Sequence, residues 1–428
     1  MLTNAPRGTK DILPSDVYKW RYVEEKFMDI CGRYNYKEIR TPTFEHTELF
    51  LRGVGETTDI VNKEMYTFED KGGRSITLKP EGTAPVVRAL IENNIYAQQQ
   101  PSKFFYAIPA FRYEKPQSGR QREFHQFGVE AFGSGDSAID AEVIALAVNF
   151  LGGLGIKGLK LHINSVGCPK CRNRYNQALR EYLKPKLKDL CSDCKVRFEK
   201  NPMRVLDCKI DGAKLTDAPL MLDYLCDDCK AHFESLQEYL KVLGIDYVID
   251  PKIVRGLDYY TKTAFEIVSS NKSSQGTVCG GGRYDGLVAE CGGPDIPGMG
   301  FGLGIERLLN VMEANNVKIP APPKLGLYIA PIGEKGKKNA QKMLYTLRNM
   351  GISAESDYLG RSIKAQMKYA NKLDANYVIV IGDNEIQNNL AEVKRMSDGS
   401  TVSVTLDESG IKTIKDMIGG SIDDGSTR

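Results

Sequence analysis

The sequence predicts an α+β core that is interrupted by a helical insertion and followed by a separate α/β domain. Two β-rich segments joined by a polar loop predict an antiparallel hairpin in the core. A cysteine- and lysine-rich stretch with helical spacing comes later, and a Pro-rich linker then precedes a β-α-α-β pattern. A chain of 428 residues favours two to three domains. The predicted boundaries are a discontinuous core at 1–167 and 246–319, an insertion at 168–245 and a C-terminal domain at 323–428.

The first half of the core supplies a helix, a short strand and the hairpin. Residues 15–34 carry apolar side chains at steps of three and four, which predicts an amphipathic helix with Ser15 as its N-cap. A short strand is expected at Glu38. The hairpin strands are predicted at 103–113 and 123–132, with a mobile polar loop between them.

After the insertion, β-like sequence returns at 247–250 and 263–268. A Gly-rich strand and a helix are predicted over 298–315. In the C-terminal domain we expect a strand in LGLYIAPI, a helix through Met350, a helix near 361–373 and a strand in NYVIVIGD.

Composition narrows the class of protein. The chain is 41% hydrophobic and 26% charged, has no apolar run of 18 residues, and begins without the apolar core of a signal peptide. These features predict a cytoplasmic protein that does not enter a membrane. The net charge is only +3, but residues 168–200 hold ten Lys and Arg against four Asp and Glu. Such a stretch suits phosphate binding and a solvated helical face equally well.

Six of the ten cysteines form three C-x-x-C pairs. The first two pairs are 19 residues apart, which is within the range of zinc ribbons. This spacing predicts a structural zinc bound by Cys168, Cys171, Cys191 and Cys194. Reduced thiols are the alternative, because the three pairs and Cys208 exceed the four ligands of one zinc site.

The strand at 123–132 has two different faces. Its period of two separates His125 and its apolar partners from Gln126, Gly128 and Glu130. Glycine weakens a strand unless something approaches closely, so we expect open space above Gly128 with an amide and a carboxylate beside it. A solvent-exposed strand face would give the same pattern.

A second open face is predicted where four glycines alternate between 298 and 304. A flat ligand could lie against this bare strand. The sequence has neither a P-loop nor a dinucleotide loop, so any nucleotide must be held by side chains. Guanidinium groups clamp phosphates and stay charged when buried, and five lie in the segments singled out here: Arg112, Arg120, Arg122, Arg255 and Arg307.

These segments carry a resemblance to a known family. Phe111-Arg-Tyr-Glu with Arg122-Glu-Phe-His-Gln-Phe-Gly-Val-Glu resembles motif 2 of class II aminoacyl-tRNA synthetases, and Gly300-Phe-Gly-Leu-Gly-Ile-Glu-Arg resembles motif 3. Val254-Arg-Gly-Leu-Asp-Tyr-Tyr-Thr and Gly281-Gly-Arg-Tyr-Asp-Gly-Leu are similar to motifs of the histidyl-tRNA synthetases. The segments Pro6-Arg-Gly-Thr-Lys-Asp and Lys79-Pro-Glu-Gly-Thr match that family as well. The resemblance covers nearly the whole chain.

The resemblance implies a class II synthetase-like antiparallel sheet with flanking helices and an anticodon-binding C-terminal domain. It implies that a catalytic core binds histidine through Glu81, Gly82, Thr83, Gln126, Glu130, Tyr259, Tyr260 and Tyr284. The carboxylates should lie near the α-ammonium group, and the tyrosines should close on the imidazole.

The same resemblance implies the ATP site. Arg112, paired with Glu114, and Arg255 should reach the α-phosphate from two sides. Phe124 and Arg307 should sandwich the adenine, while Arg120 lies in the motif 2 loop near the tRNA acceptor end. Mg²⁺ should bridge the departing phosphates.

The function implied is ligation of L-histidine to tRNA(His) at the expense of ATP, by a homodimer. One alternative is an inactive relative that serves as a regulatory subunit of ATP phosphoribosyltransferase. It is disfavoured because Arg112, Arg255 and an anticodon-like domain are retained. The other is a zinc-dependent nucleic-acid-binding protein, which leaves the β-rich part of the chain unexplained.

Overall fold

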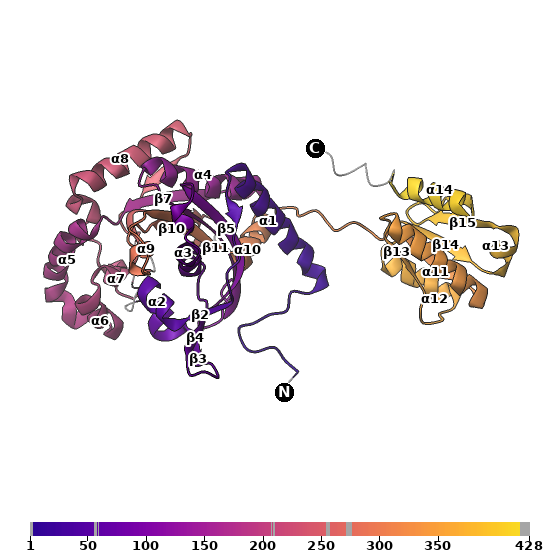
Figure 1. The fold of residues 1–428 in the computed structure, drawn as a ribbon, viewed down its shortest axis with the longest axis horizontal. Helices are drawn as coiled ribbons and strands as arrows, with labels where there is room; N and C mark the ends of the chain where they lie inside the picture. Colours follow the sequence, from indigo (N-terminus) through magenta and orange to yellow (C-terminus); the bar gives the residue numbers. More distant parts are fainter. Residues whose placement is uncertain are drawn as a thin grey trace. The chain divides into compact units, whose positions relative to one another are not determined.

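The computed structural model describes residues 3–54, 58, 60–206, 208, 210–253, 257–270 and 276–419. The chain divides into two compact units, Met1–Pro320 and Ala321–Arg428 (Figure 1). Each unit has its own sheets and its own hydrophobic core. Within the described ranges, every helix is too short or too polar to cross a bilayer.

The first unit is built on an eight-stranded sheet. Its pairs are antiparallel except at the two edges, where β1 runs parallel to β5 and β8 runs parallel to β7. The predicted antiparallel-rich sheet and the predicted hairpin, β5 with β6, are therefore confirmed. In spatial order the strands are β1 (Lys37–Glu38), β5 (Ser102–Phe111), β6 (Glu123–Phe132), β11 (Gly298–Gly304), β10 (Gly276–Arg283), β9 (Thr261–Ser269), β7 (Leu159–Ser165) and β8 (Tyr247–Ile249).

Helices and a small sheet surround this large sheet. Buried side chains of α1, α4, α8 and α10 join the core on one face of the large sheet. The bounds in this part of the chain are α1 (Pro14–Arg33), α2 (Thr47–Val54), η1 (Ile60–Glu64), α3 (Thr83–Glu92), η2 (Ile95–Ala97), α4 (Ser137–Gly153), α9 (Leu287–Glu290) and α10 (Ile305–Ala314). The small sheet has the order β2 (Phe44–His46), β4 (Ser75–Leu78), β3 (Tyr66–Glu69).

One local expectation for the core was wrong, and strand β10 was missing from the expected elements. Helix α1 begins at Pro14 with Leu13 as N-cap, not at Ser15. Proline has the φ of a first helical turn and no N–H that would need a partner there. Strand β10 was not expected either, because its run of glycines lacks the β-branched residues that predict strands.

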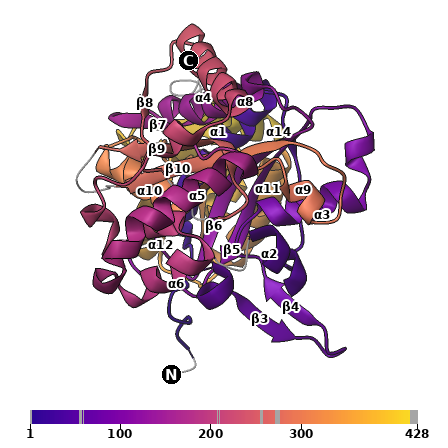
Figure 2. The same ribbon diagram turned by 90° about the vertical axis from the view of Figure 1, so that its left-hand side faces the viewer.

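The insertion between β7 and β8 consists of helices and short turns. They gather on one side of the first unit (Figures 1 and 2). Each of α5, α6 and α8 begins directly after the first cysteine of a C-x-x-C pair. The bounds are α5 (Pro169–Leu183), η3 (Lys184–Asp189), α6 (Ser192–Lys200), α7 (Met203–Leu206), η4 (Gly212–Lys214), η5 (Met221–Tyr224) and α8 (Asp227–Val242).

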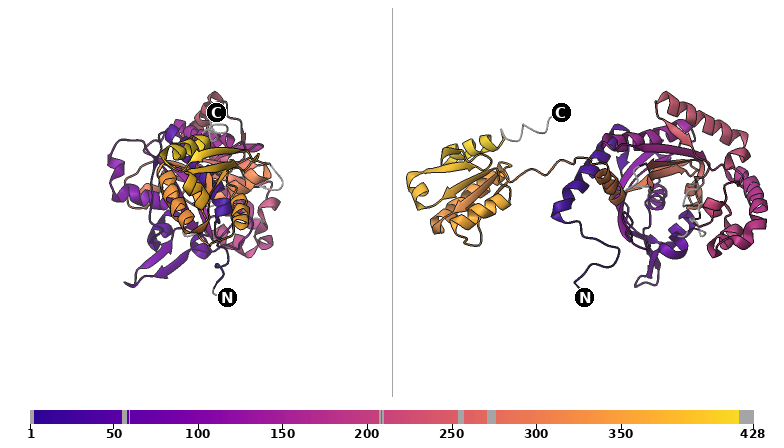
Figure 3. Two further views of the ribbon diagram at one scale, coloured as in Figure 1. Left: turned by 90° about the vertical axis from the view of Figure 1, so that its right-hand side faces the viewer. Right: turned by 180° about the vertical axis from the view of Figure 1, so that it is seen from behind.

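The second unit is a five-stranded sheet with helices on both faces (Figure 3). The predicted β-α-α-β pattern lacked β13, a short strand between the two helices, because three residues carry little periodicity. The strands in spatial order are β13 (Ala354–Ser356), β12 (Leu327–Pro331), β14 (Tyr377–Ile381), β15 (Leu390–Arg395) and β16 (Thr401–Thr405). The helices are α11 (Gly333–Asn349), α12 (Ile363–Lys372), α13 (Asp383–Asn388) and α14 (Glu408–Gly419).

A buried ion pair ties the large sheet to its helices. Arg283, at the end of β10, is fully buried and donates to both carboxylate oxygens of Asp140 in α4. Thr263 in β9 donates to the same carboxylate at 2.6 Å, and His232 of α8 lies 2.8 Å from it. Arg283 also donates to Asp285 at 3.0 Å. The carboxylate thus links two strands, a core helix and a helix of the insertion.

We predict that Arg283→Met lowers the free energy of unfolding of the first unit by about 3–5 kcal/mol, because Asp140 would be left buried without its cation. Urea unfolding followed by fluorescence measures this, since Trp20 in α1 is the single tryptophan. Arg74→Met is the control. Arg74 pairs with Asp70 on the surface, and such a pair contributes less than about 1 kcal/mol to the free energy of unfolding. Equal shifts for the two variants would contradict the prediction.

Candidate active site

A cavity of about 290 Å³ opens on the large sheet of the first unit. Its walls come from η1, the start of α3, the hairpin, the segment before β9, β10, β11 and α10. Eleven of the sequence-predicted site residues line it: Glu81, Thr83, Arg112, Glu114, Arg120, Phe124, Gln126, Tyr259, Tyr260, Tyr284 and Arg307. Gly82 and Glu130 are not part of this lining, and Arg255 lies outside the described residues.

Glu130 lies beneath the cavity with 1% of its surface exposed. Its carboxylate accepts hydrogen bonds from Thr83 Oγ1 at 2.7 Å, from the Tyr106 hydroxyl at 3.0 Å and from the Tyr284 hydroxyl. Burial nevertheless raises the pKa of Glu130 to about 8, because desolvation penalises the charged form more than these donors favour it. A neighbouring cation would be needed to ionise this group at neutral pH.

Glu81 and Gly82 shape the start of α3. The two carboxylate oxygens of Glu81 accept from the backbone N–H groups of Thr83 at 2.7 Å and Ala84 at 2.8 Å. Glu81 therefore satisfies free donors of the first helical turn, while its side chain still lines the cavity. Burial raises the pKa of Glu81. A Cβ on Gly82 would lie 2.3 Å from the Tyr106 ring, so this glycine makes room for a tyrosine.

The open space expected above Gly128 is filled. A Cβ at Gly128 would lie 2.3 Å from atoms of the Tyr106 side chain, whose hydroxyl reaches Glu130. The expectation of ligand space there was wrong because the facing strand β5 supplies a large side chain. Tyr106 is also the site residue that sequence reasoning missed. It lies opposite Gly128 in the hairpin register, and that pairing could have indicated it.

The glycines of β11 clear space for polar side chains of β6. A Cβ at Gly300 would lie 2.1 Å from Glu130 Oε2, and a Cβ at Gly302 would lie 2.2 Å from Gln126 Nε2. Gln126 Oε1 is buried, and no donor among the described residues reaches it. An unsatisfied buried acceptor is costly, so this oxygen is prepared for a donor that a ligand supplies.

Three buried tyrosines form another wall. The ring centroid of Tyr259 lies 4.7 Å from that of Tyr260 and 5.5 Å from that of Tyr284. Burial raises the pKa of Tyr259 and Tyr284 well above the usual value, so both hydroxyls remain protonated donors. Next to them, Asp258 accepts from Arg204 Nε at 3.1 Å, which joins this wall to the insertion.

The opposite wall is cationic. Arg112 donates to the Pro80 carbonyl at 2.8 Å, and its guanidinium lies 5.2 Å from the centre of the Phe124 ring. Glu114 lies between Arg112, at 4.0 Å, and Arg120, at 3.4 Å. Arg307 donates to the Thr277 carbonyl at 2.8 Å. Burial and, to a smaller extent, the nearby Arg120 lower the pKa of Arg307. The three guanidinium groups on this wall suit an anion.

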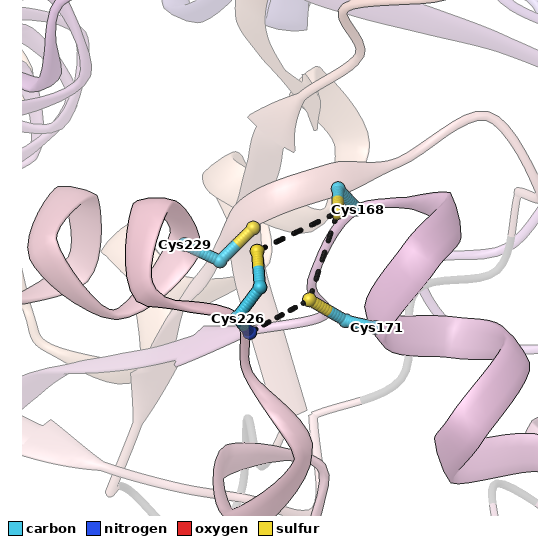
Figure 4. Close-up of side chains that lie close together, drawn as sticks. All are labelled: Cys168, Cys171, Cys226 and Cys229. Atoms are coloured by element: carbon cyan, nitrogen blue, oxygen red, sulfur yellow. Dashed lines mark hydrogen bonds between the residues drawn. The ribbon is translucent and has the colours of Figure 1, made fainter.

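The structure does not bring the four expected metal ligands together. Cys168 and Cys171 lie with Cys226 and Cys229, as Figure 4 shows. Cys191 and Cys194 instead lie with Cys208 and Asp211. The sequence spacing was misleading because α5 and η3 separate the first two pairs, and ligands distant in sequence complete each group.

A largely antiparallel sheet with an arginine-lined cavity agrees with the class II aminoacyl-tRNA synthetases, whose motifs the sequence resembles. A family model described as histidyl-tRNA synthetase matches residues 8–308, and one described as anticodon binding domain matches residues 327–416. The chain belongs to the histidyl-tRNA synthetase family. The predicted family, the predicted fold class and the predicted kind of enzyme, an aminoacyl-tRNA ligase, are confirmed.

Individual relatives agree with this assignment. The Histidine–tRNA ligase of Thermoanaerobacter sp. (strain X514) is 61% identical over 410 residues, which are 95% of this chain and 98% of the relative. That of Clostridium perfringens (strain SM101 / Type A) is 58% identical over 97% of this chain and 100% of its own. The apo S. aureus histidyl-tRNA synthetase structure is 44% identical, with a TM-score of 0.83, and the match covers 96% of this chain and 99% of that one.

We predict that Glu130 makes stability fall as pH rises. Its folded-state pKa of about 8 exceeds the ordinary 4.5, so its contribution is complete below about pH 4.5 and is lost as pH rises through 8. The loss should be on the order of a few kcal/mol. Unfolding by urea at pH 5 to 8 should therefore show a smaller decline for Glu130→Gln than for the unaltered chain. Glu25→Gln, at an exposed position of α1, should follow the unaltered chain. Parallel curves for all three proteins would contradict the pKa assignment.

Proposed function

We propose that this chain is a histidine–tRNA ligase, which converts ATP, L-histidine and tRNA(His) into histidyl-tRNA(His), AMP and diphosphate through histidyl-adenylate. The observation that carries the proposal is one cavity with a cationic wall facing a buried amide acceptor and three tyrosines. Relatives at 58–61% identity over nearly their full length favour this function over that of the regulatory relative.

The amino acid is proposed to bind on the tyrosine side of the cavity. Gln126 Oε1 lacks a donor, and the α-ammonium or an imidazole N–H of histidine would supply one. A cationic ammonium near Glu130 would also favour the ionised form of that carboxyl. Glu81, Gly82, Thr83, Tyr259, Tyr260 and Tyr284 complete the proposed histidine site. Buried groups left unpaired would reject analogues without hydrogen-bonding groups by roughly 10⁴-fold.

ATP is proposed to bind on the arginine side. Arg112, with Glu114 beside it, would hold the α-phosphate, and Phe124 and Arg307 would enclose the adenine with Arg120 nearby. Arg255 remains a proposed second contact to the α-phosphate. Mg²⁺ prefers oxygen ligands, usually keeps several waters and binds carboxylates and substrate phosphates, so ATP oxygens and the Glu114 carboxylate suit it. When bound, it would neutralise charge on the departing diphosphate.

Two steps follow from this arrangement. The histidine carboxylate attacks the α-phosphorus, and diphosphate leaves with the electrons of the broken P–O bond. A terminal ribose hydroxyl of tRNA(His) then attacks the acyl carbon, and AMP leaves. Fixed guanidinium groups favour the first step because negative charge grows on the α-phosphate oxygens. No nucleophile from the protein is required.

The remaining partners belong to the same proposal. Residues 323–428 would recognise the anticodon, which the family match of this segment supports. We propose a homodimer on the family resemblance, and a cytoplasmic location because tRNA charging takes place there and a chain with ten cysteines suits a reducing compartment.

Histidine-dependent exchange of radiolabelled diphosphate into ATP tests the function. The purified chain should catalyse exchange with histidine and show no exchange with the other amino acids. Arg112→Ala, purified in the same way, should lose the activity. A contaminating host synthetase would instead give equal exchange in both preparations. A folded chain without histidine-dependent exchange would support the regulatory relative instead.

Replacement of Gln126 by Ala should raise the KM for histidine by about tenfold or more and leave the KM for ATP nearly unchanged, because a buried hydrogen bond is lost on the amino-acid side alone. Gly302→Ala should act in the same direction, since its Cβ would displace the Gln126 amide. Equal changes in both KM values would remove Gln126 from the histidine site.

A further inference from the structure

Three helices of the insertion start with the same arrangement. Cys168, Cys191 and Cys226 are the N-cap residues of α5, α6 and α8, and the second cysteine of each pair follows in the first turn. In every pair the first thiol is half-buried and the second is buried. The backbone therefore turns both sulfurs of a pair toward one point at the start of each helix.

The first cluster joins two of these helix starts. Cys168 Sγ lies 3.6 Å from Cys171 Sγ and 3.9 Å from Cys226 Sγ, and Cys229 completes a set whose sulfurs all lie within 4.8 Å of one another (Figure 4). The backbone N–H of Cys226 donates to Cys171 Sγ at 3.1 Å. The two pairs are 54 residues apart in sequence, yet four sulfurs surround one point.

The second cluster joins the start of α6 to the turn after α7. Cys191 Sγ lies 3.8 Å from Cys208 Sγ, which lies 3.9 Å from Asp211 Oδ2, and Cys194 is the fourth member. Asp211 is 1% exposed and accepts from the backbone N–H of Cys191 at 2.9 Å. Lys214 Nζ lies 3.5 Å from Asp211 Oδ1, so the carboxylate has a cation on its outer side while Oδ2 faces the thiols.

We infer that the insertion holds two structural zinc ions, one bound by Cys168, Cys171, Cys226 and Cys229 and the other by Cys191, Cys194, Cys208 and Asp211. Tetrahedral zinc with Zn–S bonds of about 2.3 Å puts its sulfurs about 3.8 Å apart, which agrees with the observed spacings. Four thiolates, or three thiolates and a carboxylate, are both ligand sets that zinc accepts.

The zinc ions would add fixed links between helices that already pack through buried apolar residues such as Tyr175, Leu179 and Met221. One ion connects α5 to α8, and the other connects α6 to the turn after α7. The basic stretch from 168 to 200 contains ligands of both ions, which would hold α5 and α6 in place despite the repulsion between their positive charges. The inference does not depend on the ligase activity, because no residue of either cluster lines the cavity on the large sheet.

Metal analysis of the full-length chain, purified without chelator and without a metal-binding tag, tests the inference. We expect two zinc ions per chain. The Cys226→Ser/Cys229→Ser variant and the Cys194→Ser/Asp211→Asn variant should each retain one ion. Cys291→Ala, outside the insertion, should retain two. Trp20 fluorescence in a urea titration shows whether the core of each variant is folded.

Cobalt exchanged into the unaltered chain gives a second measurement that needs no substitution. Thiolate-to-cobalt charge-transfer absorption should correspond to seven thiolates shared by two tetrahedral ions. Fewer than two zinc ions in the unaltered chain, iron in place of zinc, or disulfides in place of free thiols would each overturn the inference. Loss of both ions from either variant would overturn the assignment of two separate ligand sets.

Discussion

The buried pair of Arg283 and Asp140 is the interaction on which the site depends most. Arg283 ends β10, and the next residue, Tyr284, donates to Glu130 from across the sheet. Because Asp140 also holds Thr263 of β9 and His232 of α8, a change in this pair would move two strands and the last helix of the insertion together. A buried pair of this kind costs desolvation energy. Here the pair fixes the position of Tyr284, the residue that follows Arg283.

Around the cavity, glycines leave space that is filled by side chains of neighbouring segments. Gly82 and Gly128 give up their side-chain space to the ring of Tyr106, while Gly300 and Gly302 give theirs to Glu130 and Gln126. Large polar side chains can then lie flat over a sheet without steric conflict. An alanine at one of these glycines would add a single carbon, but that carbon would lie within about 2.3 Å of a functional side chain. This is why the motifs that carry the chemistry are rich in glycine.

Much of this arrangement was readable from the sequence, and the failures have specific causes. Period-two alternation predicted the faces of β6, so Gln126 was correctly expected on the side away from the apolar core, and it lines the cavity. Alternation along one strand cannot say what the neighbouring strand contributes, so Tyr106 above Gly128 was missed. Cysteine spacing identified three C-x-x-C pairs but not which pairs meet, because that depends on the path of α5 and η3 through the insertion.

The cavity contains polar groups whose burial is unfavourable unless a ligand pairs with them. Gln126 Oε1 is buried without a donor, and the carboxyl of Glu130 is buried enough to keep its proton near neutral pH. Both costs disappear when a ligand brings N–H donors and positive charge, and neither disappears for an apolar ligand of the same size. The arginine wall has the opposite requirement, because Arg120 adds a positive charge close to Arg307 and a bound anion would offset it. One cavity therefore has a side that suits a cationic amine and a side that suits a phosphate chain, which is what the proposed histidine and ATP sites require.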